Sequence, residues 1–118
     1  MSDWEKRLEE LSQLEDGWYN SEGYSISQDA IENTRKIMRC LQNHYKQTNL
    51  PTIFPTPQGE VQLQCSLEEG SLYGEVLIET QERYEGYLLF HLTGQEQHHD
   101  LYDWADAASF IKTWFGDE

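Results

Sequence analysis

The stretch LYGEVLIETQERYEGYLLFHLT, residues 72–93, decides the predicted fold. Apolar and polar side chains alternate along 72–80 and again along 84–93, the pattern of two strands that each bury one face. We expect the two strands to pair in the register that keeps apolar side chains on one face, with a three-residue connection centred on Arg83. A register shifted by one residue would set Glu75 against Phe90 and mix polar with apolar side chains on both faces. The expected apolar pairs are Val76 with Phe90, Ile78 with Leu88 and Gly74 with Leu92.

This register also predicts a surface on the face opposite the core. The expected pairs there are Glu75 with His91, Glu79 with Tyr87 and Leu77 with Leu89. The predicted partner-binding residues are Tyr73, Glu75, Leu77, Glu79, Glu85, Tyr87, Leu89 and His91. Two interpretations are open: an ordinary solvated sheet face, or a docking patch of aromatic and leucine side chains with an acidic rim.

Two amphipathic helices are predicted before the sheet. The first has Ser2 and Glu5 as a capping box, and the second has Ser27 as its N-cap with Ile26 packed on Ile31. The apolar series of the first helix is Trp4, Leu8, Leu11 and Leu14. The buried stripe expected for the second is Ile31, Thr34, Ile37, Met38, Leu41 and Tyr45. Between them, 16–25 is predicted to be an irregular loop held by its aromatics, Trp18, Tyr19 and Tyr24.

A strand beginning at Val61 and a closing helix complete the predicted fold. The helix has Asp103 as its cap and Gly116 as its stop signal. Its expected apolar stripe is Trp104, Ala107, Ala108, Ile111, Trp114 and Phe115. We therefore predict a single α+β domain over 1–118, with two N-terminal helices in 1–50, a three- to four-stranded antiparallel sheet in 51–102, and a C-terminal helix, 103–116, packed on one sheet face.

The chain is strongly acidic, and the excess charge lies in its C-terminal half. Its 22 acidic and 8 basic residues give a formal charge of -14. Residues 1–50 hold nine acidic and six basic residues, whereas 51–118 hold thirteen acidic residues and only Arg83 and Lys112. This composition argues against direct binding to nucleic-acid phosphates or anionic membranes, which depends on clustered cations. Solubility alone is the simpler explanation of the charge, although it does not require the two halves to differ.

A cytoplasmic location is expected. The first ten residues are too charged for a signal segment, and the longest apolar run, 87–90, is too short to span a bilayer. Cys40 and Cys65 have neither metal-site nor redox spacing, and both are predicted to be inert core thiols.

His98, His99 and Asp100 raise the question of a metal site. Adjacent histidines diverge in most backbones, and Asp103 and Asp106 are already explained as residues at a helix start. We therefore expect a solvated loop here with no metal and no cofactor, although binding of a small ligand or metal near the histidines stays open. No nucleophile elbow, phosphate loop or His-Glu-x-x-His motif is present, so a non-enzymatic protein is expected.

The first two-thirds of the chain resembles a loosely defined group of small bacterial proteins of uncharacterised function. The shared features are Leu14 through Gly17-Trp18, Ile26-Ser27-x-x-Ala30-Ile31, and Pro55-Thr56-Pro57-Gln58-Gly59 leading into Val61-x-Leu63. The group typically has Asp and Gly where this chain has Tyr19 and Asn20. The resemblance implies a bacterial or phage-related intracellular α+β domain and implies no catalytic residues.

The leading functional hypothesis is an acidic, non-enzymatic module that docks on a basic protein surface, in the manner of an antitoxin, an immunity protein or an inhibitor of a nucleic-acid enzyme. Carboxylates such as Glu75, Glu79, Glu85 and Glu96 would steer association, and the outer tyrosines and leucines would supply apolar contact. In a special case, the carboxylates would mimic phosphates and block a basic groove of the partner. One alternative is a small enzyme or ligand-binding protein that uses the region from His91 to Asp106. Another is an accessory subunit that forms a homodimer through its outer sheet face.

Overall fold

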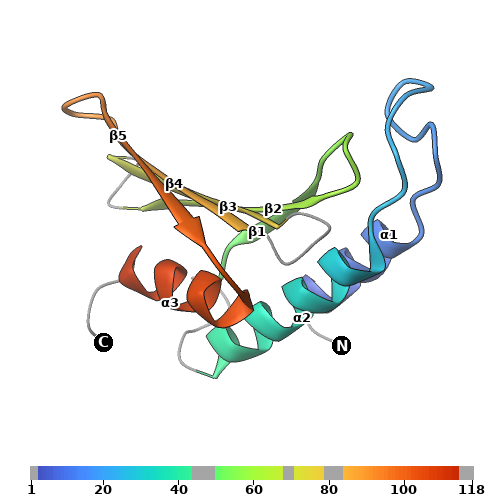
Figure 1. Ribbon diagram of the computed structural model, residues 1–118, viewed down its shortest axis with the longest axis horizontal. Coiled ribbons are helices and arrows are strands. Elements are labelled where there is room, and N and C mark those ends of the chain that lie inside the picture. The colour runs from blue at the N-terminus through green and yellow to red at the C-terminus, as the bar shows by residue number, and fades with distance from the viewer. Residues whose placement is uncertain (1–2, 44–49, 68–70, 79–83, 115–118) are drawn as a thin grey trace.

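The computed structural model describes residues 3–43, 50–67, 71–78 and 84–114 (Figure 1). Its elements, in chain order, are α1 (Asp3–Ser12), α2 (Gln28–Gln42), β1 (Thr52–Pro55), β2 (Val61–Leu67), β3 (Leu72–Ile78), β4 (Tyr84–Phe90), β5 (Gln95–Leu101) and α3 (Trp104–Trp114). The α+β class and the order of helices and sheet match the prediction. None of the described helices combines the length and apolar character needed to cross a bilayer.

The strands form one antiparallel sheet in the order β1-β2-β3-β4-β5. The three helices lie on one side of it in Figure 1, where α1 contacts β1, α2 contacts β2 and β3, and α3 contacts β3 and β4. The expectation of three or four strands was wrong, because the structure adds two strands that were not predicted: β1 among the prolines, and β5 where a loop around His98 and His99 was expected. Strand β5 is polar except for Leu101 and is mostly exposed, so it lacks the apolar alternation that indicates a strand in sequence.

The register predicted for the central hairpin was also wrong, although the predicted faces were right. Val76 pairs with Gly86 rather than Phe90, a slip of four residues. An even slip leaves every side chain on its expected face. The connection accordingly spans 79–83 rather than three residues, and it lies outside the described residues together with Glu79. The outer-face pairs become Tyr73 with Leu89, Glu75 with Tyr87 and Leu77 with Glu85.

Packing of α3 on two glycines gives a physical reason for the observed register. A Cβ atom placed on Gly74 would lie 2.7 Å from the Trp114 ring, and one on Gly86 would lie 2.6 Å from the Phe110 ring. The two rings are four residues apart on α3, a rise of about 6 Å. In the observed register Gly86 lies opposite Val76, two residues along β3 from Gly74. The predicted register would separate the glycines by six residues, about 20 Å, too far for both rings to use them.

The core follows the predicted helix stripes closely. The buried members of the α1 and α2 stripes are Trp4, Leu8, Leu11, Ile31, Thr34, Ile37, Met38 and Leu41. In α3 the buried set gains Phe110, and Trp104 is only half-buried. Leu14, just after the end of α1, is half-buried against the core, and Tyr45 and Phe115 lie outside the described residues.

The two predicted helix caps differ in the structure. Asp103 Oδ1 accepts a 2.8 Å hydrogen bond from the backbone N–H of Asp106, so Asp103 caps α3 as expected. Ser27 occupies the N-cap position of α2, but its side chain makes no capping hydrogen bond. Ser2 of the predicted capping box on α1 lies outside the described residues.

The loop between α1 and α2 contains a tight turn. Tyr19 and Glu22 exchange two backbone hydrogen bonds of 2.8 and 2.7 Å, and the residues between them, Asn20 and Ser21, have positive φ. The expectation that all three aromatics hold this loop was wrong, because Tyr19 and Tyr24 are 50% and 68% exposed. Trp18 is the one that packs against the core and donates a 2.7 Å hydrogen bond to the carbonyl of Tyr24.

Candidate functional site

The outer face of the sheet, on the side away from the helices, carries the candidate site. Antiparallel pairing across β3, β4 and β5 arranges its side chains in three rows. The rows are Tyr73, Leu89 and Glu96; Glu75, Tyr87 and His98; and Leu77, Glu85 and Asp100. We call these nine residues the outer patch. Each row mixes an aromatic or leucine side chain with at least one carboxylate, so apolar and acidic groups alternate over the whole patch.

Two tyrosine hydroxyls of the outer patch donate to carboxylates. Tyr73 Oη lies 2.7 Å from Glu75 Oε2, and Tyr87 Oη lies 2.8 Å from Glu96 Oε1. Desolvation of Tyr73 and its hydrogen bond to Glu75 raise the pKa of this hydroxyl. The hydrogen bond to Glu96 is the main cause that raises the pKa of Tyr87. Both hydroxyls therefore stay protonated donors at neutral pH, and each fixes a carboxylate beside its ring.

Ring contacts join these pairs into one cluster across three strands. Tyr73 meets Tyr87 edge to face, with ring centroids 6.4 Å apart, and the Tyr87 and His98 centroids are 5.0 Å apart. Such contacts restrict the orientations of the aromatic side chains. Beside them lies a hollow of about 220 Å³ whose lining residues are Glu75, Leu77, Glu85, Gly86, Tyr87 and His98. The outer patch thus combines ordered aromatic rings with an acidic depression.

Six of the eight predicted partner-binding residues occupy this face: Tyr73, Glu75, Leu77, Glu85, Tyr87 and Leu89. His91 does not, because β4 ends at Phe90 and His91 begins the turn at 91–94, so Tyr87 takes the expected place of His91 opposite Glu75. Glu79 lies outside the described residues.

No protein-family model, curated protein or solved structure matches this chain. What the outer patch does must therefore be argued from its chemistry. Within the part of the chain that the structure describes, the five strands contribute no lysine or arginine to this face, so its four carboxylates are the charged side chains that the strands place there.

Two residues of the outer patch, His98 and Asp100, were not predicted to belong to it, and Glu96 was predicted only as one of the carboxylates that steer a partner. Glu96, His98 and Asp100 come from β5, which was expected to be a loop. A faint signal is present: these three residues alternate with Gln97, His99 and Leu101, and only the last is apolar.

The two adjacent histidines diverge, as predicted. The His98 ring contacts Tyr87 on the outer face, whereas the His99 ring lies 4.9 Å from Phe110 of α3. Over residues 3–43, 50–67, 71–78 and 84–114, no group of three or more His, Cys, Asp or Glu side chains is arranged to hold a metal ion. The two histidine rings are therefore not placed to bind the same metal ion.

Both cysteines are free thiols and are half-buried rather than fully buried. Burial raises the pKa of Cys65. The thiolate, which is the reactive form, is correspondingly disfavoured at neutral pH.

Proposed function

We propose that this chain is an acidic, non-enzymatic protein-binding module whose outer patch docks on a basic protein surface. The observation that supports this best is the pair of tyrosine hydroxyls bonded to Glu75 and Glu96, on a face to which the described strands contribute no lysine or arginine. A merely solvated face needs neither ordered aromatic rings nor a single sign of charge. Both features suit recognition of a cationic partner.

The two kinds of side chain have different roles on this proposal. Glu75, Glu85, Glu96 and Asp100 attract a basic surface over a distance and so accelerate association. Tyr73 and Tyr87, already held by their hydrogen bonds, supply rigid contact area that loses little conformational entropy on binding. The half-buried Leu77 and Leu89 add apolar contact that slows dissociation.

The class of protein that fits this design is an antitoxin, an immunity protein or an inhibitor, acting in the bacterial cytoplasm on a nuclease, a toxin or another nucleic-acid-binding protein. The carboxylates would then occupy the basic groove that normally receives phosphates. Direct binding of this chain to nucleic acid is not part of the proposal, because its charge of -14 repels phosphates.

Affinity capture with a matched pair of variants tests the outer patch. The Leu77→Ser/Leu89→Ser variant removes the apolar contact, and Leu92→Ser is the control because Leu92 is 90% exposed in the turn after β4. Immobilised parent protein and control variant should retain the same basic protein from a lysate of the source cell. The patch variant should lose that protein while its circular dichroism spectrum stays unchanged.

Two outcomes would contradict the proposal. One is a folded patch variant that retains every protein recovered with the parent. The other is a retained set of proteins that are acidic or neutral, because the carboxylates of the outer patch would then have no complementary charge.

A further inference from the structure

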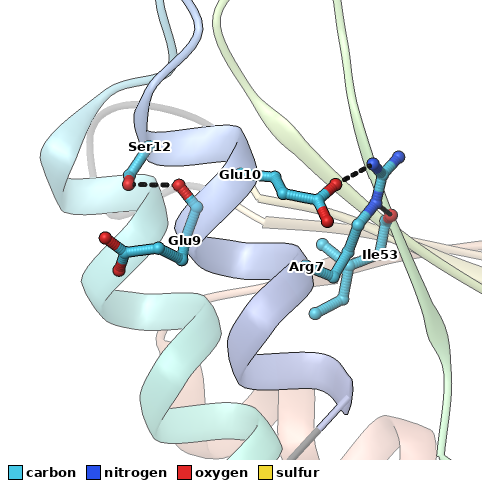
Figure 2. A network of polar contacts seen from close by, with 5 residues as sticks. All are labelled: Arg7, Glu9, Glu10, Ser12 and Ile53. Atoms are coloured by element: carbon cyan, nitrogen blue, oxygen red, sulfur yellow. Dashed lines mark hydrogen bonds and ion pairs between the residues drawn. The ribbon is translucent and has the colours of Figure 1, made fainter. Parts of the chain in front are cut away.

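The sheet has two edge strands, β1 and β5, and β1 is protected against pairing with a further strand. It has only four residues, and Arg7 of α1 donates a 3.0 Å hydrogen bond through Nε to the carbonyl of Ile53 (Figure 2). Arg7 is itself paired with Glu10. The strand ends at Pro55, which has no N–H to offer. Short length, a covering helix and a proline are the usual means of blocking an edge against further strands.

Strand β5 at the other edge has none of these protections. It is seven residues long and contains no proline and no lysine. Among the described elements, β4 is the only one that packs extensively against it. A long edge strand left open in this way is a template for pairing with another extended chain.

The register fixes which β5 residues present their backbone to the open edge. Just beyond the ends of β4 and β3, the N–H of His91 donates to the carbonyl of Ser71, so these two residues continue the ladder as a hydrogen-bonded pair. Hydrogen-bonded and non-bonded pairs alternate along an antiparallel ladder, so the odd-numbered residues of β4 direct their N–H and C=O groups toward β3 and the even-numbered ones toward β5. The even-numbered residues of β4 pair with the odd-numbered residues of β5. The N–H and C=O groups of Glu96, His98 and Asp100 therefore point away from β4. The same alternation also directs the backbone of Ile53 outward on β1, in agreement with the bond from Arg7.

The same three residues carry their side chains on the outer face. An incoming antiparallel strand would therefore place alternate side chains directly across from Glu96, His98 and Asp100. A second copy of this chain, paired about His98, would set Glu96 against Asp100 and bring together two molecules of charge -14. A strand with cations at those positions would instead form opposite-charge pairs.

We propose that the open edge of β5 accepts an extended basic segment of the partner protein as a sixth, antiparallel strand. The segment carries Lys or Arg at two positions four residues apart, opposite Glu96 and Asp100, and a side chain between them that lies beside His98 and the Tyr87 ring. This inference rests on the proposed function and specifies it further: the partner adds a strand to the sheet and continues the outer patch.

Three synthetic peptides, each as long as β5, test this pairing. The matched peptide has arginine at its second and sixth positions and threonine elsewhere. The first control has the same composition with the arginines at the third and fifth positions, so that their spacing no longer fits Glu96 and Asp100. The second control keeps the matched sequence and carries backbone N-methyl groups at the second, fourth and sixth positions, which removes the donors that β5 would meet.

The matched peptide should bind about tenfold or more tightly than either control, since each loses hydrogen bonds or ion pairs. Amide hydrogen exchange should slow at Glu96, His98 and Asp100 in the bound protein. The His98→Pro variant should also weaken binding by about tenfold, because proline removes one outward N–H and spares the ladder with β4. If that variant fails to fold, the N-methylated peptide still provides the comparison.

Equal binding of the N-methylated and matched peptides would overturn the inference. Binding of all three peptides with spectral changes at Tyr73 and Leu77 but not in β5 would overturn it while leaving the proposed function standing. Failure of every basic peptide, together with failure to capture a basic partner, would refute both. Dimers in sedimentation with protected β5 amides would show that the occupant is a second copy and would also overturn the inference.

Discussion

At the scale of single residues, the tyrosines of the outer patch are the most informative groups. A tyrosine on a solvated face has water as its partner and no need of a carboxylate. Tyr73 and Tyr87 instead hold Glu75 and Glu96 at 2.7 and 2.8 Å. Each hydrogen bond fixes a ring and a charge at once, so under the proposed function these groups would be in place before a partner arrives.

The causes of the two raised pKa values differ, and this difference is testable. The hydrogen bond to Glu96 dominates for Tyr87, so Glu96→Gln should return the pKa of Tyr87 most of the way to its ordinary value. Desolvation dominates for Tyr73, so Glu75→Gln should lower its pKa only in part. Spectrophotometric titration of tyrosinate in the two variants, with Tyr73→Phe and Tyr87→Phe to assign the transitions, measures both effects. Equal shifts in the two variants would contradict this assignment of causes.

The same hydrogen bonds give stability a dependence on alkaline pH. The folded pKa values of Tyr73 and Tyr87 lie above that of an unfolded chain, which is about 10. The contribution of these bonds to the free energy of unfolding is therefore complete below about pH 10 and is lost as the pH rises through the folded pKa values. Urea unfolding of the parent and of Tyr73→Phe/Tyr87→Phe at several alkaline pH values should show a steeper loss in the parent. Parallel curves would be evidence against this coupling.

Glycine is required at positions 74 and 86 because the rings of Trp114 and Phe110 approach the backbone of Gly74 and Gly86 closely, and not because the backbone there has a positive φ. Gly74→Ala and Gly86→Ala should each lower the free energy of unfolding by about 1–3 kcal/mol, because the new methyl group meets the Trp114 or Phe110 ring at under 3 Å. Ser66→Ala, at an exposed outer position of β2, is the control and should change stability by less than about 0.5 kcal/mol. Urea denaturation compares the three variants. A neutral Gly86→Ala would mean that α3 is not held against the sheet as described.

At the scale of elements, the two helix caps provide a matched test. Asp103→Ala should cost about 1 kcal/mol of unfolding free energy, because it removes the acceptor for the Asp106 N–H at the start of α3. Asp103→Asn should retain most of that stability, since asparagine also caps. Ser27→Ala should change stability by only a few tenths of a kcal/mol, because the Ser27 side chain makes no capping bond. Equal losses for Asp103→Ala and Ser27→Ala in thermal or urea unfolding would refute this distinction.

The alternation of apolar and polar residues predicts which sheet face a side chain lies on, but it does not predict which residues pair across two strands, as the β3–β4 hairpin shows. Alternation assigns Val76 to the core and Glu75 to the outer face in any register that differs by an even number of residues. The choice among those registers depends on contacts from elsewhere in the chain, here the rings of Phe110 and Trp114 on two glycines. Such contacts join residues far apart in sequence and leave no local pattern.

Strand β5 was not predicted, and the reason is different. Its backbone pairs with β4, but its side chains bury little apolar surface, so the usual signal of a strand is nearly absent. The carboxylate of Asp100 was missed with it, and Glu96 was predicted to attract a partner but was not placed on the sheet. The part of the site that was predicted came from β3 and β4, where a buried opposite face makes the alternation clear.

At the scale of the whole molecule, the asymmetry of charge follows the sheet. The helices α1 and α2 carry the described basic residues of the N-terminal half, whereas the five strands carry none. Among the residues of the described strands, a cationic protein approaching from the outer side would therefore meet carboxylates and no positive charge. The net charge should act mainly on the rate of encounter, and the aromatic and leucine groups on the lifetime of the complex.

Kinetics measured against salt with the captured partner separate these two effects. The association rate constant of the parent should fall roughly tenfold or more from low to high ionic strength, because screening removes electrostatic steering. Glu75→Gln/Glu85→Gln/Glu96→Gln should start with slower association and a weaker salt dependence. Leu77→Ser/Leu89→Ser should leave association and its salt dependence nearly unchanged and accelerate dissociation. If the glutamine variant associates as fast as the parent at low salt, the carboxylates do not steer the partner, and the charge of -14 serves solubility alone.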